Sequence, residues 1–593
     1  MSEQKLQIIK AVRVRKFNTN EDRDSIYDYS IVLIYKDEET GKKFHKIIDD
    51  PEFTFYITKE EKEDDYPEYV DVIPINDVEE IKCCYSDLYK EISMLLNDYS
   101  NFKTLKKNKD WAAMKQRYHL DRRIHGSDVD LEDYYIGKHY EKYPLENSNS
   151  ILTKGYFDIE VYTENYVGFP EAEVADCPID QIGYFDDIEY TFYGFLLNNP
   201  NVKAIKPFKD NKSEIEDFYN MIKKRYKDKY NLDIKIKLEW FDYEYDLIVA
   251  FWDRVNTNKP DFLTGWNICN FDIPYILNRL RREIREEFED ITEYGVEDKV
   301  KEIICGSDFE KKYRYQYLYK DLKQADFSDK GDYFVATSYT NYVDGMLLFA
   351  NLRKIFGKRE SYELDAIARE ELGESKEPLD PENKGITIKN IVSKDYKRYI
   401  KYNIHDVMLL FLLEEKNSDI DQLYSVASMT ETRIYKCLKK TICLKNLSRR
   451  FNRQQGFISS NNHNADYTNE KSRSTKSFRG AFVADPNLID NVGMKIDGDK
   501  LSQFLHEHVI DFDLSALYPS ITLAFNISPS TYYGKVFYCK EDGTSDKDIN
   551  KGADLFDRIN SRDYINIAKD EFNLPSPIDI IDEIYKEREE NNG

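Results

Sequence analysis

The sequence has few features of a secreted or membrane-bound protein. Its 593 residues include only eight cysteines, and no two of them form a Cys-x-x-Cys pair that would indicate a zinc site or a redox motif. No apolar run approaches the roughly 20 residues that a membrane-spanning helix needs. The first residues also lack the apolar stretch and cleavage site of a signal peptide. We therefore expect a cytoplasmic protein with reduced thiols.

An excess of positive charge is also missing. Lysine and arginine total 86 against 111 acidic residues, which gives a net charge of −25. Nucleic-acid binding relies on basic residues that displace counterions, but the placement of charge matters more than its sum. The stretch 436–453 (KCLKKTICLKNLSRRFNR) contains no acidic residue. It either faces a phosphate backbone or forms a solvated helix face, and the sequence leaves both interpretations open.

Length and composition favour a multidomain α/β protein. Hydrophobic residues make up 41% and charged residues 33%, which is typical of a folded protein of several domains. Strand-like runs at 151–163 and 187–198 are followed by segments with helical spacing, and this alternation predicts an α/β domain. Helices are predicted after it, and a strand-rich unit begins near residue 482. The predicted domains are 1–149, 150–415, a helical return segment and linker at 416–480, and 481–593.

The segment YFDIE carries two acidic residues on one strand. Because side chains alternate along a strand, Asp158 and Glu160 point to one face while Phe157 and Ile159 point to the other. Two carboxylates on one face are costly unless a cation neutralises them. The alternative is an edge strand that exposes its acidic side chains to water. This motif alone does not decide between a metal site and an edge strand.

A second acidic segment, WNICNFDIPY, stands at the start of a predicted helix. Pro274 favours the first helical turn, so Asp272 is expected near the helix N-terminus. A simple capping carboxylate is the alternative. Asn267 and Phe271 lie just upstream on the same connection.

A third segment, YNIHD, places Tyr402 and Asp406 four residues apart, on one face of a predicted helix. A long apolar run follows at once, so this helix is expected to be deeply packed, and an acid at its edge needs a partner. A surface contact between the tyrosine and the aspartate is the alternative. His405 points in another direction, and we assign it no role.

Together the three segments supply four carboxylates and a phenol. Hard oxygen ligands of this kind favour Mg²⁺ or Mn²⁺ over zinc. Two such ions about 3.5–4 Å apart can activate a water molecule and stabilise the leaving 3′ oxygen of a phosphodiester. A free phenol has a pKa of about 10, so Tyr402 is expected to orient the water rather than to act as a strong base. The predicted metal ligands are Asp158, Glu160, Asp272 and Asp406.

These segments resemble the three exonuclease motifs of the family B DNA polymerases, and most closely those of T-even-type bacteriophages. GYFDIEV, TGWNICNFDIPYILNR and YNIHDV occur in the order of the family. The resemblance implies a ribonuclease-H-like 3′–5′ proofreading exonuclease domain at 150–415, with two Mg²⁺ ions, or Mn²⁺, at its site. It assigns the metal ions to Asp158, Glu160, Asp272 and Asp406, the attacking water to Tyr402, and the frayed 3′ end of the substrate to Asn267 and Phe271.

A fourth segment, FDLSALYPS at 512–520, resembles the first palm motif of the same family. The resemblance implies that Asp513 binds a metal ion of the polymerase site, with the Leu514 carbonyl as a further ligand. Main-chain N–H groups near Ala516 and Leu517 would meet the nucleotide triphosphate. Tyr518 takes the place of the steric gate that rejects a ribose 2′-hydroxyl. Ala516 departs from the common serine of the family.

The fingers motif and the second palm aspartate motif of the family do not occur in this sequence. We therefore expect the N-terminal subunit of a split phage DNA polymerase, with proofreading activity and half of a palm. A second chain would supply the fingers, the rest of the palm and the thumb. The other expected partners are primer–template DNA, a single-stranded 3′ end and dNTP, in the cytoplasm of an infected bacterial host, with no membrane. A free-standing exonuclease with a palm remnant, a non-catalytic DNA-tethering subunit and an incomplete reading frame remain as alternatives.

Overall fold

The computed structural model describes most of residues 6–461. The gaps are 18–26, 67–69, 144–150, 165, 289, 323–326, 358 and 382–383, and beyond 461 only residues 520–521, 524, 537–538 and 565–566 are described. The chain divides into two compact units, Met1–Ser477 and Phe478–Gly593. In the second unit, β17 (Phe537–Tyr538) pairs with β18 (Ile565–Asn566) in antiparallel orientation. The predicted palm residues lie outside the described residues: Asp513, Leu514, Ala516, Leu517 and Tyr518.

A mixed six-stranded sheet forms the centre of the first unit. Its strand order is β11-β10-β9-β8-β12-β15. β9 is antiparallel to both of its neighbours, whereas β8, β12 and β15 run parallel to one another, as do β10 and β11. The strands are β8 (Lys154–Val161), β9 (Ile179–Asp186), β10 (Thr191–Leu197), β11 (Lys235–Phe241), β12 (Phe262–Gly265) and β15 (Asn341–Asp344).

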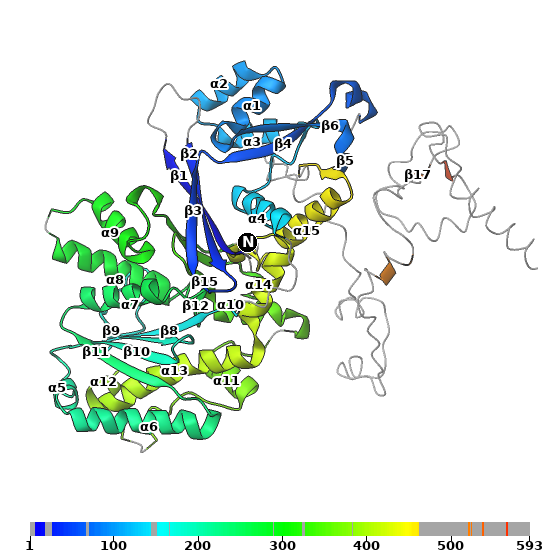
Figure 1. Ribbon diagram of the computed structural model, residues 1–593. Coiled ribbons are helices and arrows are strands. Elements are labelled where there is room, and N and C mark those ends of the chain that lie inside the picture. The colour runs from blue at the N-terminus through cyan, green and yellow to red at the C-terminus, as the bar shows by residue number, and fades with distance from the viewer. Residues whose placement is uncertain are drawn as a thin grey trace, which may run out of the picture. The chain divides into compact units, whose positions relative to one another are not determined.

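Helices cover both faces of this sheet, as Figure 1 shows. On one face, α13 (Tyr396–Asn417) and α6 (Lys212–Tyr230) pack against Tyr156 of β8 and Phe185 of β9. On the other face, α7 (Glu244–Asn258) and α8 (Asp272–Glu287) pack against Phe157 and Ile159 of β8. The predicted α/β fold is therefore confirmed for this region, because alternate side chains of β8 enter two different cores.

Shorter elements complete the region. An extra strand, β9, lies between the two strands predicted at 151–163 and 187–198, which correspond to β8 and β10. The remaining helices and strands are α5 (Ile205–Lys209), α9 (Glu293–Cys305), α10 (Gly345–Leu352), α11 (Leu364–Leu372), α12 (Ile391–Lys394), β13 (Gln316–Tyr319) and β14 (Tyr333–Ala336).

The described N-terminal residues form two three-stranded antiparallel sheets and four α-helices. One sheet has the order β1-β2-β3 and the other the order β6-β4-β7. The strands are β1 (Leu6–Phe17), β2 (Tyr27–Asp37), β3 (Lys43–Asp49), β4 (Glu52–Thr58), β6 (Val78–Cys84) and β7 (Ile124–His125), and the helices are α1 (Leu88–Leu95), α2 (Tyr99–Lys107), α3 (Trp111–His119) and α4 (Leu131–Lys142).

Buried lysines connect the β1–β3 sheet to the central sheet. Lys36 and Lys43 each place the side-chain nitrogen 2.7 Å from a different carboxylate oxygen of Asp261, just before β12. Lys10 of β1 donates to the carbonyl oxygen of Thr340 at 2.5 Å. Burial lowers the pKa of Lys10 to about 7.

The chain returns to the N-terminal sheets after the central sheet is complete. α14 (Asp419–Met429) and α15 (Lys440–Gln454) lead to β16 (Phe457–Ser459), which pairs antiparallel with β5 (Val72–Pro74). The amide of Asn461 then donates to the carbonyl oxygens of His119 and Ile124 at 2.9 and 3.1 Å. The N-terminal fold is thus built from two segments that are far apart in the sequence.

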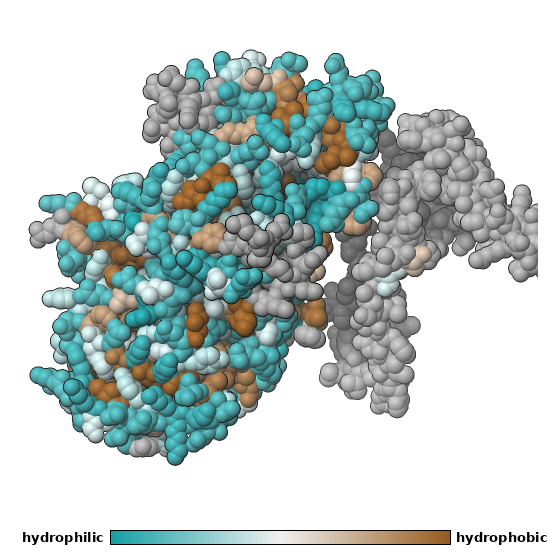
Figure 2. Space-filling view, viewed as in Figure 1, coloured by the Kyte–Doolittle hydropathy of each residue, from teal (hydrophilic) through white to brown (hydrophobic). Residues whose placement is uncertain are grey.

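Much of the basic stretch 436–453 pairs with acidic residues of this chain. Lys445 and Arg449 both contact Asp128, and Arg453 contacts Glu431. These cations are partly neutralised in place, so the structure favours neither interpretation of the stretch over the other. The face in Figure 2 is largely hydrophilic, with scattered hydrophobic patches. Of the helices in the described residues, none combines the length and apolar character that crossing a membrane requires.

Candidate metal centre

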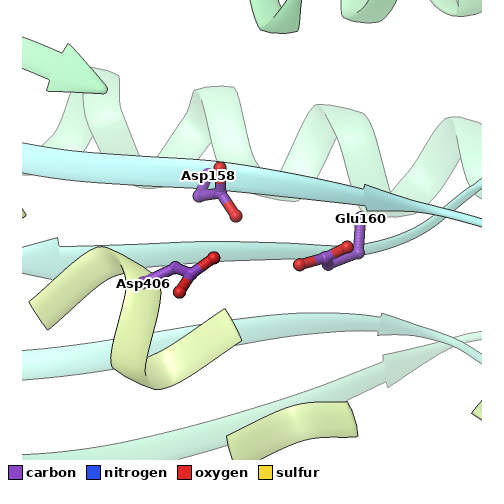
Figure 3. Close-up of side chains that lie close together, drawn as sticks. All are labelled: Asp158, Glu160 and Asp406. Carbon is purple, nitrogen blue, oxygen red and sulfur yellow. The ribbon is translucent and has the colours of Figure 1, made fainter. Parts of the chain in front are cut away.

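Acidic side chains from a strand and a helix converge beside the central sheet. Asp158 and Glu160 project from β8 on the face that α13 covers, and Asp406 projects from α13. One carboxylate oxygen of each lies within 4.8 Å of the others. Figure 3 shows the three carboxylates directed toward one another. The residues inferred from strand alternation and from helical spacing therefore lie close together in the structure.

Asp272, the fourth predicted ligand, is adjacent to this group but does not belong to the set of three. It is the first residue of α8, with Pro274 in the first turn as expected. Its carboxylate accepts a hydrogen bond from the backbone N–H of Ile159 at 3.4 Å. Because Ile159 lies between Asp158 and Glu160, this contact brings the start of α8 against the acidic segment of β8.

A single cleft of about 1080 Å³ contains all the residues predicted for the exonuclease site. Phe169, on the loop after β8, also lines it and is 75% exposed. Its ring centroid is 5.5 Å from that of Phe271. The cleft thus has an acidic wall and an aromatic wall. The predicted residues in its lining are Asp158, Glu160, Asn267, Phe271, Asp272, Tyr402 and Asp406.

Lys376 is a site residue that the sequence analysis missed. Its side-chain nitrogen lies 2.5 Å from a carboxylate oxygen of Asp406 and 3.2 Å from the hydroxyl of Tyr402. Its backbone N–H donates to Asp365 of α11 at 2.7 Å, which fixes the segment. Lys376 stands in a loop without periodic spacing, so no sequence pattern points to it.

Burial makes the acidic cluster electrostatically unfavourable. Burial, followed by the charge of Asp406, raises the pKa of Asp158 to about 7. Burial and the charge of Asp158 raise the pKa values of Glu160 and Asp272 well above their usual range. The Lys376 ammonium opposes this effect at Asp158 and Asp406. One lysine cannot balance four carboxylates, so added cations would relieve the repulsion.

The donor set fits divalent metal ions. Every candidate ligand is a hard carboxylate oxygen, the type that Mg²⁺ and Mn²⁺ prefer. One oxygen of Asp406, Oδ1, is buried and has no hydrogen-bond partner among the described residues. A buried acceptor of this kind is costly, and a bound cation would satisfy it. The residues present therefore suit the metal ions that the sequence predicts.

His405 faces away from the acidic group, as expected. Its ring nitrogens contact the hydroxyl of Tyr226 at 3.1 Å and the carbonyl oxygen of Ser375 at 2.9 Å. Burial lowers the pKa of His405 to about 4, so the ring is neutral at physiological pH. The residue packs the helix and does not reach the cleft.

Comparison with known families supports the assignment of the cleft. Residues 106–324 match the family described as DNA polymerase family B, exonuclease domain. This chain contains a family B DNA polymerase exonuclease domain. The matched part of the exonuclease domain includes Asp158, Glu160 and Asp272, and it ends before Tyr402 and Asp406.

Similar proteins include phage and eukaryotic polymerases. The DNA-directed DNA polymerase of Escherichia phage RB69 is 26% identical over 412 residues, which cover 68% of this chain and 38% of the phage protein. That of Enterobacteria phage T4 is 25% identical over 461 residues, or 76% of this chain and 43% of the phage protein. The DNA polymerase delta catalytic subunit of Plasmodium falciparum is 27% identical over 297 residues, which cover 49% of this chain and 23% of that protein. The chain thus spans about two fifths of the length of the two phage relatives.

Proposed function

We propose that this chain is a two-metal 3′–5′ exonuclease that removes nucleotides from a single-stranded 3′ end of DNA. The convergence of Asp158, Glu160 and Asp406 within 4.8 Å, in a cleft of an exonuclease domain, is the observation that carries this proposal. Asp272 at the start of α8 would complete the ligand set. Bound divalent ions would activate a water molecule and stabilise the leaving 3′ oxygen of the phosphodiester.

Tyr402 would orient the attacking water. Burial, followed by the charge of Asp406, raises the pKa of Tyr402, so the phenol keeps its proton over the physiological range. It can then donate a hydrogen bond, while its oxygen accepts from Lys376 at 3.2 Å. The contact with Lys376 limits the rotation of the hydroxyl. A fixed donor of this kind contributes by positioning the water and not by removing its proton.

The aromatic wall would hold the DNA. Phe169 is largely exposed, and its ring lies against that of Phe271. Aromatic side chains stack on bases of any sequence, which suits an enzyme that removes whichever nucleotide is unpaired. Asn267, on the same connection as Phe271, would contact the terminal nucleotide. Proofreading of a mismatched primer end is the corresponding role.

Replacing the two acidic residues of β8 tests this proposal. Asp158→Ala combined with Glu160→Ala should abolish Mg²⁺-dependent shortening of a 5′-labelled single-stranded oligonucleotide, because the metal ions lose two ligands. Glu61→Ala with Glu63→Ala removes two acids at the same spacing from an N-terminal surface helix, and it should leave digestion unchanged. Undiminished digestion by the Asp158/Glu160 variant would refute the location of the site.

Participation in DNA synthesis is a second candidate function. The phage relatives are DNA-directed DNA polymerases that match up to 76% of this chain. Asp513 would supply one carboxylate for primer extension with dNTP and Mg²⁺, and a second chain would supply the fingers and the remaining palm. The phage setting would be the cytoplasm of an infected bacterium.

Co-expression tests the synthetic role. Mixed with a chain that carries the fingers motif and the second palm motif, this chain should extend a primer. Asp513→Ala should then stop extension and leave digestion of single-stranded DNA intact, since the two sites use different carboxylates. Absence of extension by the mixed chains would leave the chain with the nuclease role alone.

A further inference from the structure

Asn403 connects helix α13 to the carboxylate of Asp158. Its side-chain nitrogen donates to Oδ2 of Asp158 at 3.0 Å and lies 3.4 Å from the backbone carbonyl oxygen of the same residue. It follows Tyr402 directly and precedes Asp406 by less than one helical turn. We propose that Asn403, held in turn by Gln181 and accommodated by Gly183, is a positioning residue that fixes the Asp158 carboxylate for metal binding. This inference rests on the proposed exonuclease function.

The chemistry of the carboxylate sets the orientation of the amides. A carboxylate that binds a metal ion is ionised and only accepts hydrogen bonds, so Asn403 turns its NH₂ group toward Asp158. Its oxygen then faces β9, where the amide nitrogen of Gln181 donates to it at 2.9 Å. Asn403 and Gln181 are both fully buried. Since water does not compete for these groups, the path from Gln181 through Asn403 to Asp158 has one consistent direction of donation.

The register of β8 and β9 creates the space for this arrangement. Gly183 lies directly opposite Asp158, and Gln181 lies opposite Glu160. A Cβ atom on Gly183 would stand 2.0 Å from the amide oxygen of Asn403, well inside contact distance. The absence of a side chain at Gly183 therefore allows Asn403 to enter the sheet face between the two strands. The same stretch of β9 supplies both the space and the donor.

The hydrogen bond from Asn403 limits the rotation of the Asp158 carboxylate. With one lone-pair site of Oδ2 bound to Asn403, the other sites of Asp158 stay available to a metal ion shared with Glu160 and Asp406, whose carboxylate oxygens lie within 4.8 Å. Without Asn403 the carboxylate is free to turn about its terminal torsion, which is broad. Residues that orient metal ligands in this way typically change metal affinity by about 10- to 100-fold when they are replaced.

Metal binding by the full chain tests the inference. Mn²⁺ titrated calorimetrically into the wild type reports all metal sites, and the part that disappears in Asp158→Ala with Glu160→Ala belongs to the exonuclease site. Asn403→Ala should weaken that part by about 10- to 100-fold. Gly183→Ala should weaken it in the same direction, because the added methyl group displaces the Asn403 amide without removing a donor. Gln181→Ala should give a smaller loss.

A matched control separates positioning from general loss of packing. Asn351 of α10 is also buried, and its amide nitrogen also reaches two oxygens, the carbonyls of Ser328 and Leu438. Asn351→Ala should lower the melting temperature without changing Mn²⁺ affinity. In digestion assays, Asn403→Ala should raise the half-saturating Mg²⁺ concentration, and the rate should recover substantially at saturating Mg²⁺.

The outcomes distinguish this inference from the proposed function. If Asn403→Ala fails to fold, Gln181→Ala and Gly183→Ala decide the question, because they leave Asn403 itself in place. If the wild type binds Mn²⁺ and the folded variants at positions 403, 183 and 181 bind it with the same affinity, the positioning role alone is overturned. A wild type that neither binds Mn²⁺ at this site nor digests DNA overturns the proposed function and the inference together.

Discussion

Lys376 brings a positive charge to the acidic cluster before any metal ion binds. Its ammonium contacts Asp406 and Tyr402 and partly opposes the rise in the pKa of Asp158 that burial and Asp406 cause. The same charge repels a divalent cation that approaches these carboxylates. Lys376 therefore has two opposing effects. It opposes the rise in the pKa values of Asp158 and Asp406 and contacts the Tyr402 hydroxyl, and it would compete with metal ions for Asp406.

Replacement of this lysine should separate the two effects. Lys376→Met is expected to tighten Mg²⁺ binding, because a repulsive charge is removed, and to slow digestion at saturating Mg²⁺ by about tenfold or more, because a positioned polar contact is lost. Digestion rates measured across a Mg²⁺ titration check both parts. Lys416→Met, which removes a lysine paired with Glu371, serves as the control. Weaker Mg²⁺ binding together with slower digestion would contradict the proposed competition.

At the residue scale, local spacing predicted which side chains of one strand or helix lie on the same face. The alternation at Asp158 and Glu160 and the helical step from Tyr402 to Asp406 are both local, and the structure places all four in one cleft. Lys376 and Asn403 could not be predicted in this way. Asn403 contacts a residue 245 positions away, and that contact depends on the packing of α13 across the strand register of β8 and β9.

At the element scale, predictions succeeded where a strong local signal exists. Pro274 marks the first turn of α8, and the apolar run after Asp406 marks a buried helix. β9 was not predicted, because Gln181 and Gly183 interrupt its apolar pattern and both of its faces are buried. Gln181 and Gly183 are the two β9 residues next to the Asn403 side chain. The predicted domain boundaries and the palm segment stay predictions.

The contact of β1 with the central sheet should depend on pH through Lys10. Burial lowers its pKa from 10.5 to about 7, with smaller opposing effects from Cys305, which raises it, and Lys43, which lowers it. Between these two values the unfolded chain binds a proton that the folded chain does not, so the free energy of unfolding should rise with pH over this window. Below about pH 7 this contribution is flat.

Thermal melting of Lys10→Met compared with the wild type checks this dependence. The difference in melting temperature between the two proteins should change from pH 7 to pH 10. The melting temperature of the wild type should increase relative to that of the variant as pH rises. A difference that stays constant over this range would show that Lys10 keeps its ordinary pKa in the folded chain.

At the scale of the whole molecule, metal ions should act as structural ligands. Carboxylates that are crowded and buried destabilise the metal-free fold, and an ion that binds only the folded state stabilises it. At 100 times its dissociation constant a bound ion contributes about 2.7 kcal/mol. Mn²⁺ should therefore raise the melting temperature of the wild type, and EDTA should reverse the increase.

The Asp158→Ala, Glu160→Ala variant provides the comparison. In EDTA it should melt at or above the temperature of the wild type, since two half-buried acids that repel Asp406 are removed. Its melting temperature should respond less to Mn²⁺, and any remaining response would come from metal sites elsewhere in the chain. Equal Mn²⁺ responses in both proteins would mean that the acidic cluster of β8 and α13 does not bind the ion.

The return of the chain through β16 to β5 limits how this protein can be divided. Residues 457–461 close a sheet that begins nearly four hundred positions earlier, and Asn461 is hydrogen-bonded to His119 and Ile124. A recombinant fragment cut just after α13 would leave the edge of β5 unpaired and two backbone oxygens without their donor. Isolation of a well-behaved fragment with the candidate metal centre therefore calls for a boundary beyond residue 461, even though its acidic residues all precede residue 407.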